Sequence, residues 1–216
     1  MLDFHLVAPQ TLCGAFLSRR VRMGTTRSIP SASAILVVSA SLFVTLCARV
    51  SFPLPFTPVP VTLQTLGVLT AGIALGARGG FLALCAYLAE GAAGIPVFAG
   101  GAAGAHHLIG PTGGYLIAYP LAAGLAGYLA ELGWDRRPAT AFGAAVLGSV
   151  LILISGAAWL ALSTASLSRA VMLGVLPFLP GDLLKAAAAA GLLPACWKGM
   201  MYVGIAPRSA PPTFRQ

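Results

Sequence analysis

Long apolar runs with almost no charged residues constrain the fold of this chain more than any other feature. Hydrophobic residues make up 58% of the sequence and charged residues only 8%. A soluble domain carries roughly 25% charged residues, so this chain lacks the polar side chains needed to cover a surface in water. A membrane β-barrel would alternate apolar and polar residues over about ten positions, whereas these runs are unbroken and rich in alanine and leucine. The sequence therefore predicts an all-α integral membrane protein.

Six apolar runs are candidate membrane spans, because a helix needs about 20 mostly apolar residues to cross a bilayer. The third run is too short to cross alone unless it extends into the glycine-rich stretch that follows it. We expect a six-helix membrane domain at residues 31–200, with an N-terminal tail at 1–30 and a C-terminal tail at 201–216. The runs are 31–50, 61–77, 81–91, 114–131, 140–162 and 175–197.

The positions of arginine and lysine predict the orientation in the cell membrane. With a cytoplasmic N-terminus only Arg49 and Arg169 fall outside, and Lys185 lies within the last run. Positive residues accumulate in cytoplasmic loops, so both termini are predicted to be cytoplasmic. The residues expected on the cytoplasmic side are Arg19, Arg20, Arg22, Arg27, Arg78, Arg136, Arg137, Lys198, Arg208 and Arg215.

The net charge of +8 does not indicate nucleic-acid binding, because the arginines cluster at the ends of apolar runs rather than along one face. The N-terminal tail is interpreted as cytoplasmic, or as the product of a start at Met23, in preference to a transit peptide. The four cysteines are scattered without metal-ligand spacing. Adjacent His106 and His107 point apart on most backbones, so we interpret them as a solvated loop tip and expect no metal site.

Three stretches could hold chemistry on the external side. The first, 52–65, has four prolines and then Thr62, Gln64 and Thr65, which predicts a stiff extended loop before a helix. The second, 96–116, is rich in glycine, and irregular backbone at membrane depth is tolerated only where protein buries it or where it lines a cavity. In the third, Asp182 and Lys185 share one helix face. The alternatives are a rigid turn for the first stretch and a structural ion pair for the third.

Three motifs follow one another between residues 52 and 185: PFTPVPVTLQTLGVLTAGIALGARGG, then YLAEGAAGIPVFAGGAAG with GPTGGYL, then PGDLLK. Together they resemble the BioY family, the biotin-specific S components of energy-coupling-factor (ECF) transporters. The resemblance implies a six-helix S-component fold, biotin as transported substrate, and a transmembrane T component and cytoplasmic ATPases as partners. The chain has no GxxxxGK[ST] run to bind nucleotide and no catalytic constellation, so neither an enzyme nor a cofactor is expected. A self-sufficient biotin carrier is the alternative.

The resemblance also assigns site residues. Asp182 and Lys185 match the family's PGDxxK residues at the ureido end of biotin, and Gln64 matches the TLQT element. Gly100 stands where some members carry an asparagine that contacts the ligand. The implied substrate-binding residues are Asp182, Lys185, Gln64, Tyr87, Phe98, Ala99, Gly100, Gly101, Thr112, Gly113, Gly114 and Tyr115. The face expected to dock the T component is Ser33, Val37, Ser41 and Thr45, small residues at a spacing of four.

Overall fold

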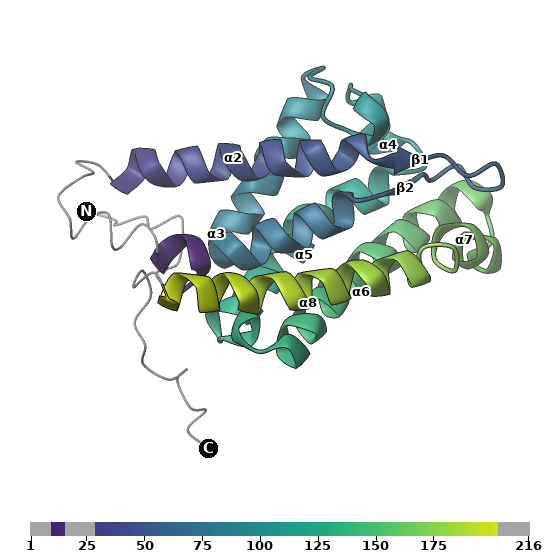
Figure 1. Ribbon diagram of the computed structural model, residues 1–216. Coiled ribbons are helices and arrows are strands. Elements are labelled where there is room, and N and C mark those ends of the chain that lie inside the picture. The colour runs from purple at the N-terminus through teal and green to yellow at the C-terminus, as the bar shows by residue number, and fades with distance from the viewer. Residues whose placement is uncertain (1–9, 16–28, 203–216) are drawn as a thin grey trace.

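The computed structural model describes residues 10–15 and 29–202, most of which are helical (Figure 1). The predictions for residues 1–9, 16–28 and 203–216, including the start at Met23, lie outside this part. The helices are α2 (Ile29–Arg49), α3 (Gln64–Ala92), α4 (His106–Ile109), α5 (Gly113–Glu131), α6 (Pro138–Thr164), α7 (Leu167–Gly174) and α8 (Leu179–Tyr202). The short 3₁₀ helices are η1 (Ala99–Gly101) and η2 (Trp134–Arg136), and the strands are β1 (Ser51–Phe52) and β2 (Val61–Thr62).

Helices α2, α5 and α6 begin and end within two residues of the predicted runs. Their ends coincide with strong local signals. Pro138 opens α6, where its missing N–H costs nothing because the first N–H groups of a helix have no partner within it. Arg49 closes α2, where a cation is favoured by the helix dipole.

Helix α3 folds back on itself at Gly76 and so covers two predicted runs. Gly76 has a φ of 86° and a ψ of 179°, a conformation that glycine adopts far more easily than other residues. The Gln64 amide donates a hydrogen bond to the Tyr87 hydroxyl at 2.6 Å, although a straight helix would separate these residues by about 35 Å. The halves 64–75 and 77–92 therefore lie side by side. The predicted start at residue 61 is wrong, because residues 61–62 form β2.

Two further features differ from the predictions. Strands β1 and β2 pair antiparallel, with Ser51 opposite Thr62 and Phe52 opposite Val61, so the fold is helical with one small ribbon. The last predicted run, 175–197, starts too early, because residues 175–178 form a turn between α7 and α8. These two helices meet at a bend of 50°.

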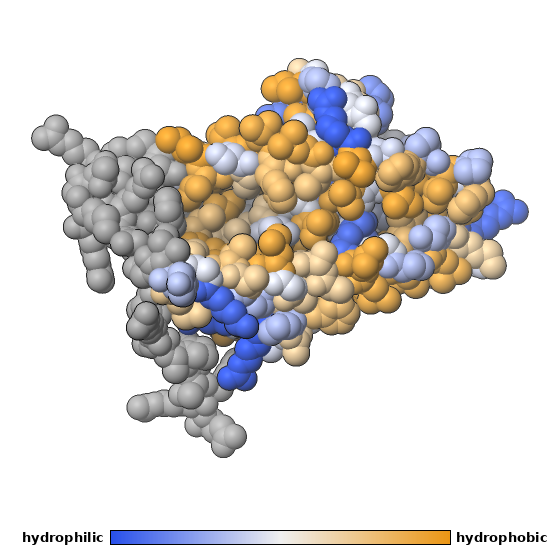
Figure 2. Space-filling view, in the orientation of Figure 1, coloured by the Kyte–Doolittle hydropathy of each residue, from blue (hydrophilic) through white to orange (hydrophobic). Residues whose placement is uncertain are grey.

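The outer face of the molecule is suited to lipid. Within the described residues, α3, α5 and α6 are long and apolar enough to cross a membrane, and α7 with α8 adds a fourth crossing if the bent pair is one span. Large apolar side chains project outward, among them Leu42, Ile154 and Leu184, which are 59%, 62% and 74% exposed. Hydrophobic residues cover most of the flank in Figure 2. Soluble monomers rarely expose apolar patches of this extent, so this is a multi-pass membrane protein.

Two apolar clusters fill the interior. One surrounds the start of α3 and the loops after it, with Tyr87 and Phe98 among its buried residues. The other lies around Ile73 and Trp197. Leu12, from the short helical turn at residues 12–15, is buried in the second cluster. Part of the segment assigned to the N-terminal tail is therefore packed against the membrane domain.

The stripe expected to dock the T component faces the interior of the protein. Ser33, Ser41 and Thr45 are only 2%, 0% and 7% exposed, and Val37 is half-buried. The Ser41 hydroxyl donates a hydrogen bond to the Glu90 carboxylate of α3 at 2.5 Å. In this structure the small residues of the stripe pack α2 against α3, so docking of the T component on this stripe stays a prediction.

Candidate functional site

A cavity of about 200 Å³ lies where the start of α3, the loop before α5 and the first turns of α5 and α8 meet. Segments more than 100 residues apart in the sequence contribute to it. The residues that line it are Pro58, Val59, Pro60, Thr62, Gln64, Thr65, Phe98, Ala99, Ala102, His107, Thr112, Tyr115, Leu116, Tyr119, Ile152, Leu153, Phe178, Asp182 and Lys185.

Asp182 and Lys185 form a buried ion pair on one wall. The Lys185 ammonium donates to the Asp182 carboxylate at 2.9 Å, and the two residues are 6% and 7% exposed. Helix α8 begins at Leu179, so Pro180 lies in its first turn and Asp182 completes that turn. A carboxylate in the first turn is favoured by the helix dipole. Two buried charges on neighbouring turns stabilise each other without an outside partner.

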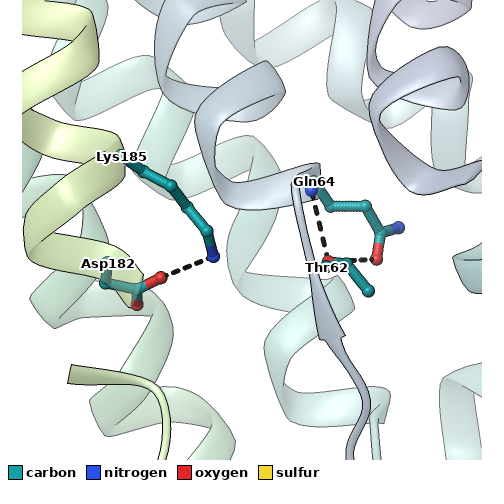
Figure 3. A network of polar contacts seen from close by, with 4 residues as sticks. All are labelled: Thr62, Gln64, Asp182 and Lys185. Carbon is teal, nitrogen blue, oxygen red and sulfur yellow. Dashed lines mark hydrogen bonds and ion pairs between the residues drawn. The ribbon is translucent and has the colours of Figure 1, made fainter. Parts of the chain in front are cut away.

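Polar groups from α3 and β2 lie on the side of the cavity toward which this pair points (Figure 3). The Thr62 hydroxyl donates to the Gln64 carbonyl oxygen at 3.1 Å, and the Gln64 backbone N–H donates to the Thr62 hydroxyl at 3.2 Å. Behind them the Tyr87 hydroxyl accepts from the Gln64 amide and donates to the Val97 carbonyl at 2.8 Å. This chain of bonds fixes the orientation of the Gln64 side chain and links α3 to the glycine-rich loop.

Aromatic rings supply the apolar walls. Phe98 packs edge-to-face on Tyr87, with ring centroids 5.7 Å apart. The Tyr115 hydroxyl donates to the Gly174 carbonyl at 2.7 Å, which holds its ring 6.3 Å from that of Phe178. The cavity thus joins a polar end, containing one ion pair and one amide, to flat apolar surfaces. Such a site suits a ligand with a polar ring and an apolar body.

The two loops over the cavity are tied down at both sides. The Thr57 hydroxyl, in the proline-rich loop, donates to the Leu173 carbonyl of α7 at 2.7 Å. In the glycine-rich loop the Arg49 guanidinium donates to the Pro96 carbonyl at 2.9 Å. The Trp159 indole of α6 donates to the Gly110 carbonyl at 3.0 Å. Side-chain hydrogen bonds to or from the neighbouring helices therefore hold both loops in place over the cavity.

The structure brings most, but not all, of the predicted site residues to the cavity. Tyr87 stands behind Gln64 rather than on the lining. Gly100, Gly101, Gly113 and Gly114 do not line it either. A Cβ on Gly114 would lie 2.2 Å from the Trp159 Cβ, so this glycine allows α5 to approach α6. The predicted residues that line the cavity are Gln64, Phe98, Ala99, Thr112, Tyr115, Asp182 and Lys185.

Sequence reasoning missed several cavity residues, of which His107 matters most. The interpretation as a solvated loop tip holds for His106, which is exposed, and is wrong for His107, which lines the cavity. Within the described residues, no group of three His, Cys, Asp or Glu side chains could hold a metal ion. Tyr119 lies one helical turn after Tyr115, so helical periodicity could have found it.

Comparisons with known proteins agree with this geometry. The model of the BioY family matches residues 19–202. A probable biotin transporter of Pyrococcus horikoshii is 44% identical over 61% of this chain and 76% of its own length. The biotin transporter of Rhizobium etli is 35% identical over 70% and 84%. The crystal structure of the S component for biotin from an ECF-type ABC transporter superposes with a TM-score of 0.73 at 29% identity, covering 80% of this chain and 94% of that one. Because the family model spans most of the chain and the fold is shared with a solved member, the chain belongs to the BioY family.

Proposed function

We propose that this chain is the high-affinity biotin-binding component of a vitamin uptake system in the cell membrane. Its family makes it a transport protein rather than an enzyme. The proposal is supported by the relatives, which are named as biotin transporters, and by the likeness to a solved S component for biotin. That likeness also supports energisation by a separate T component and a pair of ATPases.

The observation that carries the proposal is the polar end of the cavity. Biotin has a ureido group with two N–H donors and one carbonyl, fused to an apolar bicycle. The Asp182 carboxylate can accept from an N–H, and the Lys185 ammonium and the Gln64 amide can donate to the carbonyl. Phe98 and Tyr115 can cover the apolar ring faces. In this proposal biotin is the cargo and no cofactor takes part.

We further propose that the two halves of α3 cross the membrane separately. Together with α2, α5, α6 and α8 they then give six crossings, with both termini in the cytoplasm. The hydrogen bond between Gln64 and Tyr87 supports this arrangement, because it holds the halves side by side. The predominance of arginine on the predicted cytoplasmic side supports the orientation.

Titration of the purified protein with biotin tests the function. We expect a dissociation constant below about micromolar, a free energy near −8 kcal/mol or better. Asp182→Asn and Lys185→Ala should each weaken binding by about 1–3 kcal/mol, because each leaves a polar partner unmatched. Leu184→Ala is the matched control, since this neighbouring side chain is 74% exposed and should not affect affinity.

A single substitution in the ion pair also leaves one buried charge alone, which destabilises a fold strongly. The double variant Asp182→Asn, Lys185→Met removes the pair without that effect and should still lose affinity. Normal biotin binding by all three variants would place the site elsewhere. Biotin uptake by cells that lack every coupling partner would favour the self-sufficient carrier over the energised system.

A further inference from the structure

The charges that line the cavity are unevenly distributed. Asp182 and Lys185 neutralise each other at 2.9 Å, so the polar end carries no net charge. Biotin brings a carboxylate, and a buried carboxylate needs a donor or a positive partner of its own. Among the remaining residues on the lining, His107 is the one imidazole, and it comes from α4 rather than from α8.

We propose that His107 binds the carboxylate of the ligand, so that biotin lies with its ureido ring at Asp182 and Lys185 and its acid end at the loop that carries α4. The inference rests on the proposed function and adds to it a residue specific for the acid end. His107 is positioned for this role by its edge-to-face contact with Phe98, with ring centroids 6.0 Å apart. Phe98 in turn packs against Tyr87, whose hydroxyl accepts a hydrogen bond from the Gln64 amide.

The nitrogens of the His107 ring are available. No hydrogen bond or ion pair from the described residues engages them. Most other titratable side chains on the surrounding elements have partners, with the exception of Tyr119 of α5, which lines the cavity and whose hydroxyl makes no hydrogen bond within the described residues. Arg49 of α2 donates to the Pro96 carbonyl, Glu90 of α3 accepts from Ser41, and the Tyr115 hydroxyl of α5 donates to Gly174. The remaining neighbour is His106, whose ring lies 4.2 Å from that of His107 and is exposed.

Binding should then depend on pH in a predictable direction. Burial, and secondly the charge of His106, lowers the pKa of His107, so the imidazole is mostly neutral at neutral pH without ligand. A carboxylate beside it favours the protonated form. Biotin binding is therefore coupled to proton uptake from solution, and affinity should rise as the pH falls from about 8 to 6.

The test compares biotin with its primary amide, which keeps the ring and chain but carries no charge. His107→Gln should weaken biotin binding about 10- to 100-fold, the range for a hydrogen bond to a charged group, and should change amide binding little. His106→Gln, one residue away and exposed, should leave biotin binding nearly unchanged. The pH dependence should be present for wild type with biotin and absent for wild type with the amide.

The outcomes separate this inference from the function on which it rests. Wild-type protein that binds no biotin overturns both. Wild-type protein that binds biotin, with equal pH dependence for acid and amide, overturns the role of His107 alone. So does a His107→Gln variant that loses affinity for both ligands alike, because the loss is then structural. If His107→Gln does not fold, the pH dependence of wild-type binding, compared between biotin and its amide, still tests the role of His107.

Discussion

At the scale of single residues, the most unusual group outside the cavity is Asp135. It lies in η2, is completely buried, and accepts a hydrogen bond from the Trp197 indole of α8. The Arg136 guanidinium lies over the same indole, 4.7 Å from its centroid. One oxygen of the carboxylate has no hydrogen-bond partner. The three side chains fasten the loop after α5 to the far end of α8.

Asp135 should make stability depend on pH. Burial raises its pKa to about 6, partly offset by the hydrogen bond from Trp197 and the charge of Arg136. The folded protein then holds a proton that the unfolded chain has released, between about pH 4 and pH 6. The contribution is complete below pH 4 and is lost as the pH rises through 6. The midpoint of thermal unfolding in detergent, measured from pH 4 to 8, should fall accordingly.

The matched variant is Asp135→Asn, which keeps an oxygen to accept from Trp197 but cannot titrate. Its unfolding midpoint should lack the decline between pH 4 and 6 that wild type shows. Identical pH profiles for the two proteins would mean that Asp135 ionises normally in the fold.

The sequence could identify residues by their chemistry but not by their distant partners. Asp182 and Lys185 were found because a spacing of three places them on one helix face, a relation that the sequence itself contains. Asp135 was missed because its partner is 62 positions away. His107 was misinterpreted for a similar reason, since only the folded loop brings it beside Phe98 and the cavity.

At the scale of helices and strands, composition predicted some boundaries and not others. The ends of α6 followed from Pro138 and from the end of an apolar run. The two halves of α3 were predicted as two separate spans. The position of the turn between them, at Gly76, was not predicted, because several nearby glycines could adopt the backbone conformation of such a turn. The pairing of β1 with β2 could not be predicted from residues 51–62, since each strand contributes only two residues.

The crossing of α3 and α5 depends on the absence of a side chain at Gly72. A Cβ there would lie 2.3 Å from the Ala123 carbonyl oxygen and 2.7 Å from its Cα, which are backbone atoms of α5. Backbone cannot move aside as a side chain can, so Gly72→Ala must push the helices apart. Overpacking of this kind typically costs about 1–3 kcal/mol. The unfolding midpoint in detergent should fall, and biotin affinity should weaken with it.

Gly124→Ala is the control for the same pair of helices. For a Cβ on Gly124 the nearest atom would be the Ala77 carbonyl oxygen at 3.6 Å, an ordinary van der Waals distance. This variant should be at least as stable as wild type, because the added methyl group fits and alanine has a better helix propensity than glycine. Equal loss in both variants would show that the interface tolerates no methyl group anywhere, rather than being tight at Gly72.

At the scale of the whole molecule, the two ends have different roles. The cavity and the tied loops occupy the end where α3 begins, and the Asp135 contacts and the buried Leu12 occupy the other. A carrier that binds its ligand at one surface and meets its coupling partners at the other needs this division. In the proposed energised system, the surface that meets the T component would then be formed by residues outside the buried stripe on α2, or by this stripe after a movement of α2.

The separate crossing of the two halves of α3 gives a direct topology test. The turn at Gly76 then brings exposed Arg78 to the cytoplasmic surface, while Ile109 of α4, which is 78% exposed, lies outside. In a background with Cys13, Cys47, Cys85 and Cys196 replaced by serine, Ile109→Cys should react with an impermeant maleimide on intact cells. Arg78→Cys should react only after permeabilisation. If the hairpin of α3 instead entered the membrane from one side without crossing it, position 78 would lie near mid-membrane and stay unlabelled in both conditions.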